Sequence, residues 1–168
     1  MLVVFGGLPG TGKTTIARIV ARRMGAVYLR IDVIEYALWL AMDKPDDIGG
    51  AGYAIAGDLA RSNLGLGAAV IADSVNSLAL TRDGWRAAAR DAGAPCLQVE
   101  VICSDPAEHR RRVETRTLDI AMTPPTWDSV LKRAYEPWAD ADLVLDTAST
   151  GADEAAEQVM AAMRRWLA

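Results

Sequence analysis

The first fifteen residues carry the feature that restricts the fold most. Leu2–Phe5 is a short apolar run, and Gly7–Thr14 matches the pattern G-x-x-x-x-G-K-[ST] in full. Apolar residues then recur at helical spacing through residues 13–24. A strand, a glycine-rich loop and a helix in this order form the context that a phosphate-binding loop (P-loop) requires. The sequence therefore predicts a domain that binds a nucleoside triphosphate between its first strand and its first helix.

The chemistry of this loop assigns roles to its residues. Successive backbone N–H groups of a glycine-rich loop form an anion-binding concavity, and the following helix adds the positive end of its dipole. We expect Lys13 to reach the β- and γ-phosphates, the Thr14 hydroxyl to coordinate Mg²⁺, and Thr15 to donate to the α-phosphate. The predicted nucleotide-binding residues are Gly7, Leu8, Pro9, Gly10, Thr11, Gly12, Lys13, Thr14 and Thr15.

Short apolar runs alternate with stretches of helical periodicity along the whole chain. The expected strands are Leu2–Phe5, Val27–Ile31, Ala69–Ala72, Leu97–Cys103 and Leu143–Leu145. The expected helices are 13–24, 33–42, 52–66, 79–92, 106–117 (with Asp105 as N-cap and Pro106 at its first position), part of 127–137, and 152–167. This alternation predicts an α/β fold with a parallel sheet covered by helices on both faces. With 168 residues, we expect one domain spanning 1–168.

Composition excludes several other classes of protein. No apolar stretch approaches the about 20 residues of a membrane-spanning helix, and Met1 leads directly into the first strand, which leaves no room for a signal peptide. The net charge of −4 disfavours a non-specific nucleic-acid binder. Cys96 and Cys103 are interpreted as free thiols in a reducing compartment. We therefore expect a cytoplasmic protein without a membrane partner.

Asp32 follows the second expected strand, at the edge where open α/β sheets place their sites. Transfer of a phosphoryl group to a hydroxyl needs a carboxylate that orients the acceptor and takes its proton. Asp32 is the best candidate for that catalytic base. The alternative is that Asp32 only caps the helix expected at 33–42.

Asp73 closes the apolar run Ala69–Ala72, the pattern in which a carboxylate holds Mg²⁺ directly or through water. We therefore predict Thr14 and Asp73 as the metal-binding residues. Ser74, Asn76 and Ser77 follow and either line an acceptor pocket or form a polar turn before the next helix.

Arginines gather on the helix expected at 106–117. Arg112 and Arg116 are four residues apart, so they are expected to share a face. Their rigid guanidinium groups suit the charge that develops on a transferring phosphoryl group, and we predict both as catalytic. The loop 118–126 contains Pro124 and Pro125, and residues 112–126 are expected to form a short lid that excludes water.

Other residues have a functional and a structural interpretation. Arg82 can reach an acceptor or a phosphate from the helix 79–92. His109 is interpreted as a polar helix residue. The aromatic residues either border a substrate pocket or, more often at such positions, pack in the core or lid; they are Trp39, Trp127, Tyr135 and Trp138.

The chain resembles a family of small P-loop kinases that includes chloramphenicol phosphotransferase, the kinase domain of polynucleotide kinase and, more distantly, gluconate and shikimate kinases; its members often bear the label AAA-type ATPase. The resemblance rests on Gly7–Thr14, Arg30–Asp32, Ile71–Ser74 and the arginine-rich segment Glu108–Arg116. It implies a three-layer α/β/α sandwich with strand order 2-3-1-4-5. It also implies that Asp32 activates the acceptor, that Arg112 or Arg116 acts from the lid, and that residues 146–148 lie near adenine.

These observations together favour an ATP- and Mg²⁺-dependent kinase that phosphorylates a hydroxyl of a small molecule. One alternative is a kinase for 5′-hydroxyl ends of nucleic acid or for nucleotides, which would bind oligonucleotides in a salt-dependent manner. Another is a nucleotide-dependent regulatory switch, whose affinity for a partner would change with the bound nucleotide. The sequence leaves open the acceptor, the choice between ATP and GTP, and the oligomeric state.

Overall fold

The computed structural model describes residues 1–45 and 47–167, so Asp46 and Ala168 of the expected domain lie outside the described residues. The strands are β1 (Leu2–Gly6), β2 (Val27–Arg30), β3 (Val70–Asp73), β4 (Cys96–Ile102) and β5 (Leu143–Asp146). The helices are α1 (Lys13–Met24), α2 (Ile31–Ala41), α3 (Ala51–Gly65), α4 (Ala79–Asp91), α5 (Pro106–Thr115), α6 (Trp127–Leu131) and α7 (Ala152–Leu167). Every strand expected from the apolar runs is present.

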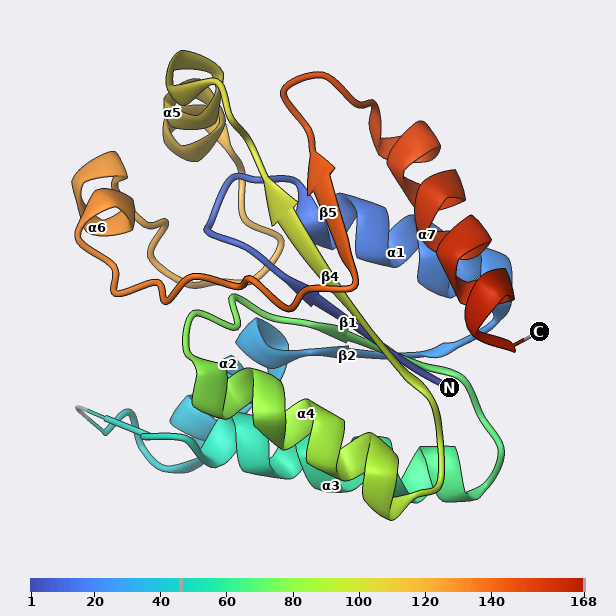
Figure 1. The fold of residues 1–168 in the computed structure, drawn as a ribbon. Coiled ribbons are helices and arrows are strands. Elements are labelled where there is room, and N and C mark those ends of the chain that lie inside the picture. The colour runs from blue at the N-terminus through green and yellow to red at the C-terminus, as the bar shows by residue number, and fades with distance from the viewer. Residues whose placement is uncertain (46, 168) are drawn as a thin grey trace.

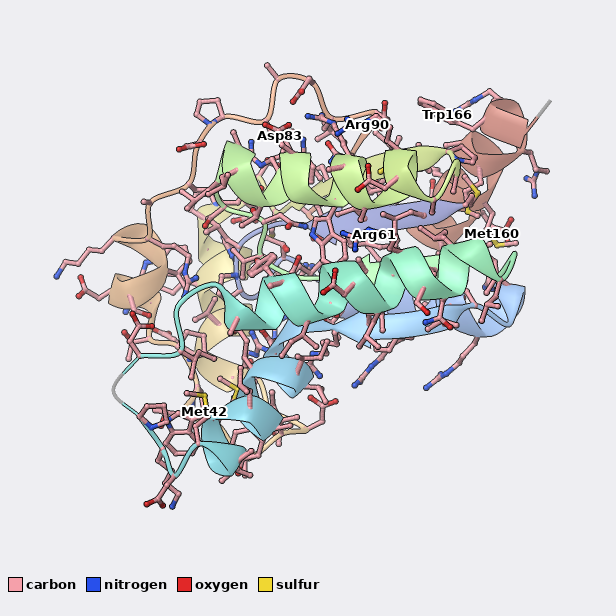
Figure 2. The ribbon with its side chains drawn as sticks, turned by 90° about the horizontal axis from the view of Figure 1, so that it is seen from below. Met42, Arg61, Asp83, Arg90, Met160 and Trp166 are labelled. Atoms are coloured by element: carbon pink, nitrogen blue, oxygen red, sulfur yellow. The ribbon has the colours of Figure 1, made fainter. Side chains whose placement is uncertain are left out.

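The five strands form one parallel sheet in the order β2-β3-β1-β4-β5. Helices α1 and α7 cover one face of the sheet, and α3 and α4 cover the other (Figure 1). Arg61 lies between α3 and α4, where its Nε is 3.6 Å from Asp91 Oδ2 (Figure 2). The predicted three-layer α/β/α fold and its strand order are confirmed.

The two cores follow from the alternation of side chains along β1. Val3 and Phe5 face α1 and α7, whereas Leu2 and Val4 face α3 and α4, and all four are fully buried. A strand that is buried on both faces has no position for a polar side chain, which is why it appears in sequence as an unbroken apolar run.

Two element boundaries differ from expectation, and both involve candidate site residues. The strand β2 ends at Arg30 and α2 begins at Ile31, so Asp32 lies in the first turn of α2 and the interpretation of Asp32 as N-cap is wrong. Helix α5 ends at Thr115, so Arg116 is its C-cap with extended dihedral angles and does not share a helix face with Arg112. The predicted Asp105 cap is confirmed, because its carboxylate accepts from the N–H groups of Ala107 and Glu108.

The carboxyl ends of the strands meet at one edge of the sheet. The loop between β1 and α1 lies at this edge, together with α5, α6 and the segment that joins them (Figure 1). Residues 116–126 form an irregular segment between these two helices, as expected of the loop 118–126. Among the described residues, none of the helices combines the length and the apolar character needed to cross a membrane.

Candidate active site

The loop between β1 and α1 depends on glycine for its conformation. Gly7 and Gly10 have φ angles of 142° and 88°, in the region that L side chains rarely adopt. A Cβ on Gly7 would lie 2.1 Å from the carbonyl oxygen of Val101, and a Cβ on Gly10 would lie 2.6 Å from Cγ2 of Val113. The close approach of the loop to β4 and α5 therefore excludes side chains at both positions.

We expect Gly10→Ala to lower the free energy of unfolding by about 1–3 kcal/mol, since it adds a strained φ angle to a close contact with Val113. The matched control is Gly84→Ala in α4, where a Cβ meets nothing within 4 Å. This control should stabilise the protein by about 0.5–1 kcal/mol, the gain of alanine over glycine inside a helix. Urea unfolding of both variants measures the difference, and equal stability of the two would contradict the structure of the loop.

Two side chains brace the loop from outside it. Nε2 of His109, a buried residue of α5, lies 2.8 Å from the carbonyl oxygen of Pro9. On the other side, the Thr147 hydroxyl lies 2.8 Å from the carbonyl oxygen of Thr11 and accepts a 2.8 Å hydrogen bond from Arg112 Nη1. His109 is thus more than a polar helix residue, because it ties α5 to the loop.

Two neighbouring cavities, each of about 410 Å³, open beside the loop. The first, which we term the phosphate cavity, is lined by Gly10, Gly12, Lys13, Thr14, Thr15, Arg18, Arg30, Arg112, Thr115, Arg116, Thr117 and Asp119. The second, the base-side cavity, is lined by Gly12, Thr15, Ile16, Arg112 and residues 147–152. Gly12 is the N-cap of α1 and has no side chain that could accept a hydrogen bond, so no capping side chain occupies the first N–H groups of α1.

Lys13 is the central cation of the site. Its side chain is only 8% exposed, and burial lowers the pKa of its ammonium group, while the neighbouring carboxylates of Asp73 and Asp32 raise it. A buried charge of this kind is weakly hydrated, so it interacts strongly with an anion that enters the cavity.

Arg30, which is 4% exposed, joins three carboxylates. Its Nη2 donates to Asp32 at 3.2 Å, its Nη1 donates to Asp119 at 2.7 Å, and its Nε lies 4.0 Å from Asp73 Oδ2. Asp119 belongs to the loop after α5 and also accepts from Arg18 of α1. These two guanidinium groups hold the pKa of the Asp119 carboxyl well below its usual range. Asp119 therefore joins the loop 116–126 to the floor of the phosphate cavity.

The surroundings of Asp73 fit a hard divalent cation. Asp73 Oδ2 accepts a 2.6 Å hydrogen bond from Tyr28, whereas Asp73 Oδ1 and the Ser74 hydroxyl are buried and have no hydrogen-bond partner among the described residues. Carboxylate and hydroxyl oxygens are the ligands that Mg²⁺ takes. Within the described ranges, no group of three or more His, Cys, Asp or Glu side chains is arranged to hold a metal ion by itself. This donor set suits Mg²⁺, which keeps waters and phosphate oxygens as ligands, better than a metal that needs an all-protein cage.

A third cavity of about 660 Å³ also has Lys13 in its wall, and we term it the acceptor cavity because it contains Asp32, the base expected from the sequence. Polar and charged residues of its wall include Asp32, Glu35, Tyr53, Ser77, Arg116 and Arg133. Leu118, Ile120 and Met122 of the loop 116–126 also line it. Lys13 and Arg116 border both this cavity and the phosphate cavity, so they stand at the boundary between the two.

The structure brings most of the sequence-predicted residues together and separates others. Arg112 lies at the boundary of the phosphate and base-side cavities, and its Nη2 donates to the Thr147 carbonyl at 3.0 Å. Of the polar residues after β3, Ser77 lines the acceptor cavity, while Asn76 is buried between Phe5 and Trp85.

Arg82 and three of the four candidate aromatic residues have packing roles. The Arg82 guanidinium lies 4.6 Å from the ring centroid of Trp138 and 5.4 Å from that of Tyr135. Trp127 packs edge-on against His109, with ring centroids 5.1 Å apart. The fourth aromatic residue, Trp39, lines a further cavity of about 350 Å³.

Sequence reasoning missed Arg18, Arg30 and Glu35 as residues of the site. Arg30 had a visible signal, because a charged residue that ends an apolar strand next to Asp32 points to the same edge of the sheet. Glu35 had one too, since it lies three residues after Asp32 and shares its helix face. Arg18 had none, because a charged residue on α1 is indistinguishable from an ordinary solvated one.

Comparisons with known proteins support the fold. The AAA domain family matches residues 2–137. A search of curated proteins found no match. Among solved structures, the chain is similar to Mycobacterium tuberculosis APS kinase CysC in complex with AMPPNP and APS (21% identity, 97% of this chain and 96% of that chain, TM-score 0.72). It is also similar to a gluconokinase from Sinorhizobium meliloti (19% identity, 98% and 91%, TM-score 0.69) and to Chaetomium thermophilum Kti12 in complex with ADP-AlF3 (20%, 96% and 98%, TM-score 0.70).

These likenesses to solved structures, at about a fifth of identical residues, concern the fold. The family match concerns the sequence and covers residues 2–137, which include β1, the P-loop, Asp32, Asp73 and α6. With the P-loop in place between β1 and α1 and most of the sequence covered, the chain belongs to the AAA domain family.

Proposed function

We propose that the protein is an ATP-dependent phosphotransferase that moves the γ-phosphoryl group of Mg-ATP to a hydroxyl of a small molecule. The observation that carries this proposal is the position of Lys13 and Arg116, which border both the phosphate cavity and the acceptor cavity. A group that passes from one cavity to the other crosses between two cations. Such cations stabilise the charge on the equatorial oxygens of a transferring phosphoryl group.

The nucleotide occupies the P-loop and the two cavities beside it. Backbone N–H groups of Gly7–Thr15 and the Lys13 ammonium bind the triphosphate, and residues 147–152 of the base-side cavity contact the adenine. Solved relatives of the same fold contain AMPPNP or ADP-AlF3, which supports a nucleotide at this position.

Thr14 and Asp73 would hold Mg²⁺, with the buried and unpartnered Asp73 Oδ1 as the observation in favour. When bound, the ion neutralises charge on the β- and γ-phosphates. The Tyr28 hydroxyl fixes Asp73 Oδ2, and burial together with Asp73 raises the pKa of Tyr28, so the phenol stays protonated as a donor.

Asp32 accepts the proton of the acceptor hydroxyl. It lines the acceptor cavity at the start of α2, and the 3.2 Å hydrogen bond from Arg30 orients its carboxylate. A carboxylate that is held in one orientation within reach of the acceptor hydroxyl has the geometry that a general base requires.

Residues 112–126 act as the lid in this proposal. In the amino-terminal part of the lid, Arg112 and Arg116 line the phosphate cavity. Further along the lid, apolar side chains line the acceptor cavity; they are Leu118, Ile120 and Met122. A closed lid of this composition excludes water, which would otherwise compete with the acceptor for the phosphoryl group.

The acceptor cavity favours a small molecule over nucleic acid. A volume of about 660 Å³ is that of an ordinary small-ligand pocket. The net charge of −4 would repel a polynucleotide backbone. The names of two structural relatives, gluconokinase and APS kinase, likewise support a small hydroxyl compound.

Two free thiols, Cys96 and Cys103, are consistent with a reducing compartment such as the cytoplasm.

We expect Asp32→Asn to lower kcat by about 10²-fold, the lower end of the range for a general base, because phosphoryl transfer relies more on positioning than on proton removal. Affinity for ATP should remain, since Asp32 lies in the acceptor cavity. A coupled assay with an acceptor found by screening small alcohols for ATP turnover above the water background measures the rate.

The matched control is Asp83→Asn, an exposed carboxylate on α4 that pairs with Arg86 and lines none of these three cavities (Figure 2). This control should keep the wild-type rate. A normal transfer rate in Asp32→Asn would remove Asp32 as the base, and an absence of acceptor-stimulated turnover across the screen would contradict the proposed function itself.

A further inference from the structure

The acceptor cavity adjoins a smaller, more apolar cavity that the proposed chemistry does not use. This apolar recess has a volume of about 350 Å³ and is lined by Tyr36, Trp39, Ile48, Ala121, Met122, Thr123 and Glu35. Glu35, Met122 and Thr123 also line the acceptor cavity, so the two spaces share a wall. A ligand that enters the acceptor cavity can therefore extend past Glu35 into the recess.

The recess has the character of a binding surface for a ring. Tyr36 and Trp39 stack with ring centroids 6.0 Å apart and an interplanar angle of 27°. The Trp39 Nε1 donates to the Pro45 carbonyl at 3.2 Å, which fixes the indole. Aromatic side chains that are held in one orientation offer a large apolar contact area at little cost in conformational entropy.

Glu35 stands at the junction of the two cavities. Its carboxylate has no hydrogen bond or ion pair with any described residue, although Arg133 is a nearby cation in the acceptor cavity. Burial and the neighbouring Asp32 raise the pKa of Glu35 to about 6, while Arg133 lowers it. A half-buried carboxylate without a partner is stabilised by a cation that supplies both charge and hydrogen-bond donors.

The packing of α3 makes room for this carboxylate. Gly52 in the first turn of α3 is buried, and a Cβ there would lie 2.4 Å from Glu35 Cγ and 3.0 Å from Glu35 Oε1. The absence of a side chain at residue 52 thus keeps Glu35 in the wall of both cavities.

We propose, on the basis of the proposed phosphotransferase, that the acceptor is an amphipathic amino alcohol: its hydroxyl lies at Asp32, its ammonium group binds Glu35, and its apolar part fills the recess formed by Tyr36, Trp39 and Met122. In this arrangement Glu35 determines specificity and takes no part in proton transfer.

Calorimetric titration of the full chain with ADP and Mg²⁺ present tests binding independently of turnover. The probes are phenylalaninol, which has hydroxyl, amine and ring; N-acetylphenylalaninol and 3-phenylpropan-1-ol, which lack the cation; and 2-aminopropan-1-ol, which lacks the ring. Phenylalaninol should bind about 10-fold or more tightly than each of the others, since a charge-assisted hydrogen bond or a buried ring contributes at least that factor.

Glu35→Gln keeps the size of the side chain and removes its charge. It should abolish the preference for phenylalaninol over its N-acetyl derivative while leaving affinity for ADP unchanged, and Glu154→Gln on the exposed face of α7 should keep both. Trp39→Leu should abolish the preference for phenylalaninol over 2-aminopropan-1-ol, and Trp166→Leu, an exposed residue of α7, should keep it (Figure 2).

The outcomes separate this inference from the proposed function. Binding with the expected preferences but no phosphoryl transfer would contradict the phosphotransferase and leave the subsite standing. If the protein transfers the phosphoryl group to other alcohols, three binding results would overturn the subsite alone. They are no preference for the amine in the wild type, no binding of phenylalaninol, and a preference for the amine that Glu35→Gln retains. A loss of kcat without a change in probe affinity in Glu35→Gln would likewise overturn it, because that result assigns Glu35 to proton transfer.

Discussion

Lys13→Ala should lower the rate of phosphoryl transfer by about 10³-fold, the upper end of the range for one preorganised electrostatic contact. Lys13 is nearly fully buried and borders both the phosphate and the acceptor cavity, so its charge acts on the group in transit where water screens it little. The carboxylates of Asp73 and Asp32, whose charges interact with the Lys13 ammonium group, would remain near the proposed position of the γ-phosphate. Repulsion then adds to the loss of attraction.

Binding of Mg-ATP should weaken in the same variant. Saturating ligand at about 100 times its Kd stabilises the wild type by about 2.7 kcal/mol, and this gain should largely disappear in thermal unfolding of Lys13→Ala. Lys13→Arg should also be impaired, because a planar guanidinium differs in shape and hydration from the compact ammonium group that the loop surrounds.

The chain offers a matched control with the same chemistry. Lys132 pairs with Asp128 at 2.8 Å, and both side chains are more than two thirds exposed, so Lys132→Ala should leave rate and nucleotide affinity unchanged. Unaltered transfer in Lys13→Ala would refute the assignment of this P-loop as the phosphoryl-binding element.

The fold was accessible from sequence because its core elements have a local signature. The apolar run Leu2–Phe5 is buried on both faces of the sheet, and such a run has few other structures open to it. The boundaries were less accessible. Whether α2 begins at residue 31 or 33 depends on where β2 stops, and β2 stops where its pairing with β3 ends, at Arg30 opposite Asp73. Asp73 lies 43 positions after Arg30 in the chain, so the periodicity of the residues around Arg30 does not show where this pairing ends.

The candidate site likewise has residues that a local sequence pattern predicts and residues that depend on contacts between distant parts of the chain. The P-loop follows β1, Asp32 lies just after the end of β2 and Asp73 is the last residue of β3, so a local pattern places them at one edge of the sheet. His109 acts through Pro9, which is 100 residues away, and Asp119 acts through Arg30, 89 residues away. Such contacts depend on how α5 and the loop after it fold back over the P-loop, and no spacing in the sequence encodes that approach.

Arg82 illustrates how a charged residue can belong to the core. Its guanidinium donates to the carbonyl oxygens of Asn76, Ser77, Glu136 and Pro137. The side chain is 2% exposed, has no carboxylate partner among the described residues, and lies against the ring of Trp138. Carbonyl dipoles and an aromatic face thus take the place of a counter-ion. The arginine joins the segment before β5 to the start of α4.

Arg82→Met should therefore lower the free energy of unfolding by at least about 3 kcal/mol, since two or more hydrogen bonds from a charged donor contribute about 1.5–3 kcal/mol each. Arg90→Met, on the exposed side of the same helix, should change it by less than about 0.5 kcal/mol (Figure 2). Urea unfolding measures both, and limited proteolysis near Tyr135 should be faster only in Arg82→Met. A contrary pattern, with stability retained and KM for the acceptor raised, would place Arg82 in substrate binding. The buried fork of carbonyl contacts argues against that result, because four of the five N–H donors of the guanidinium already bond to carbonyl oxygens and the residue is 2% exposed.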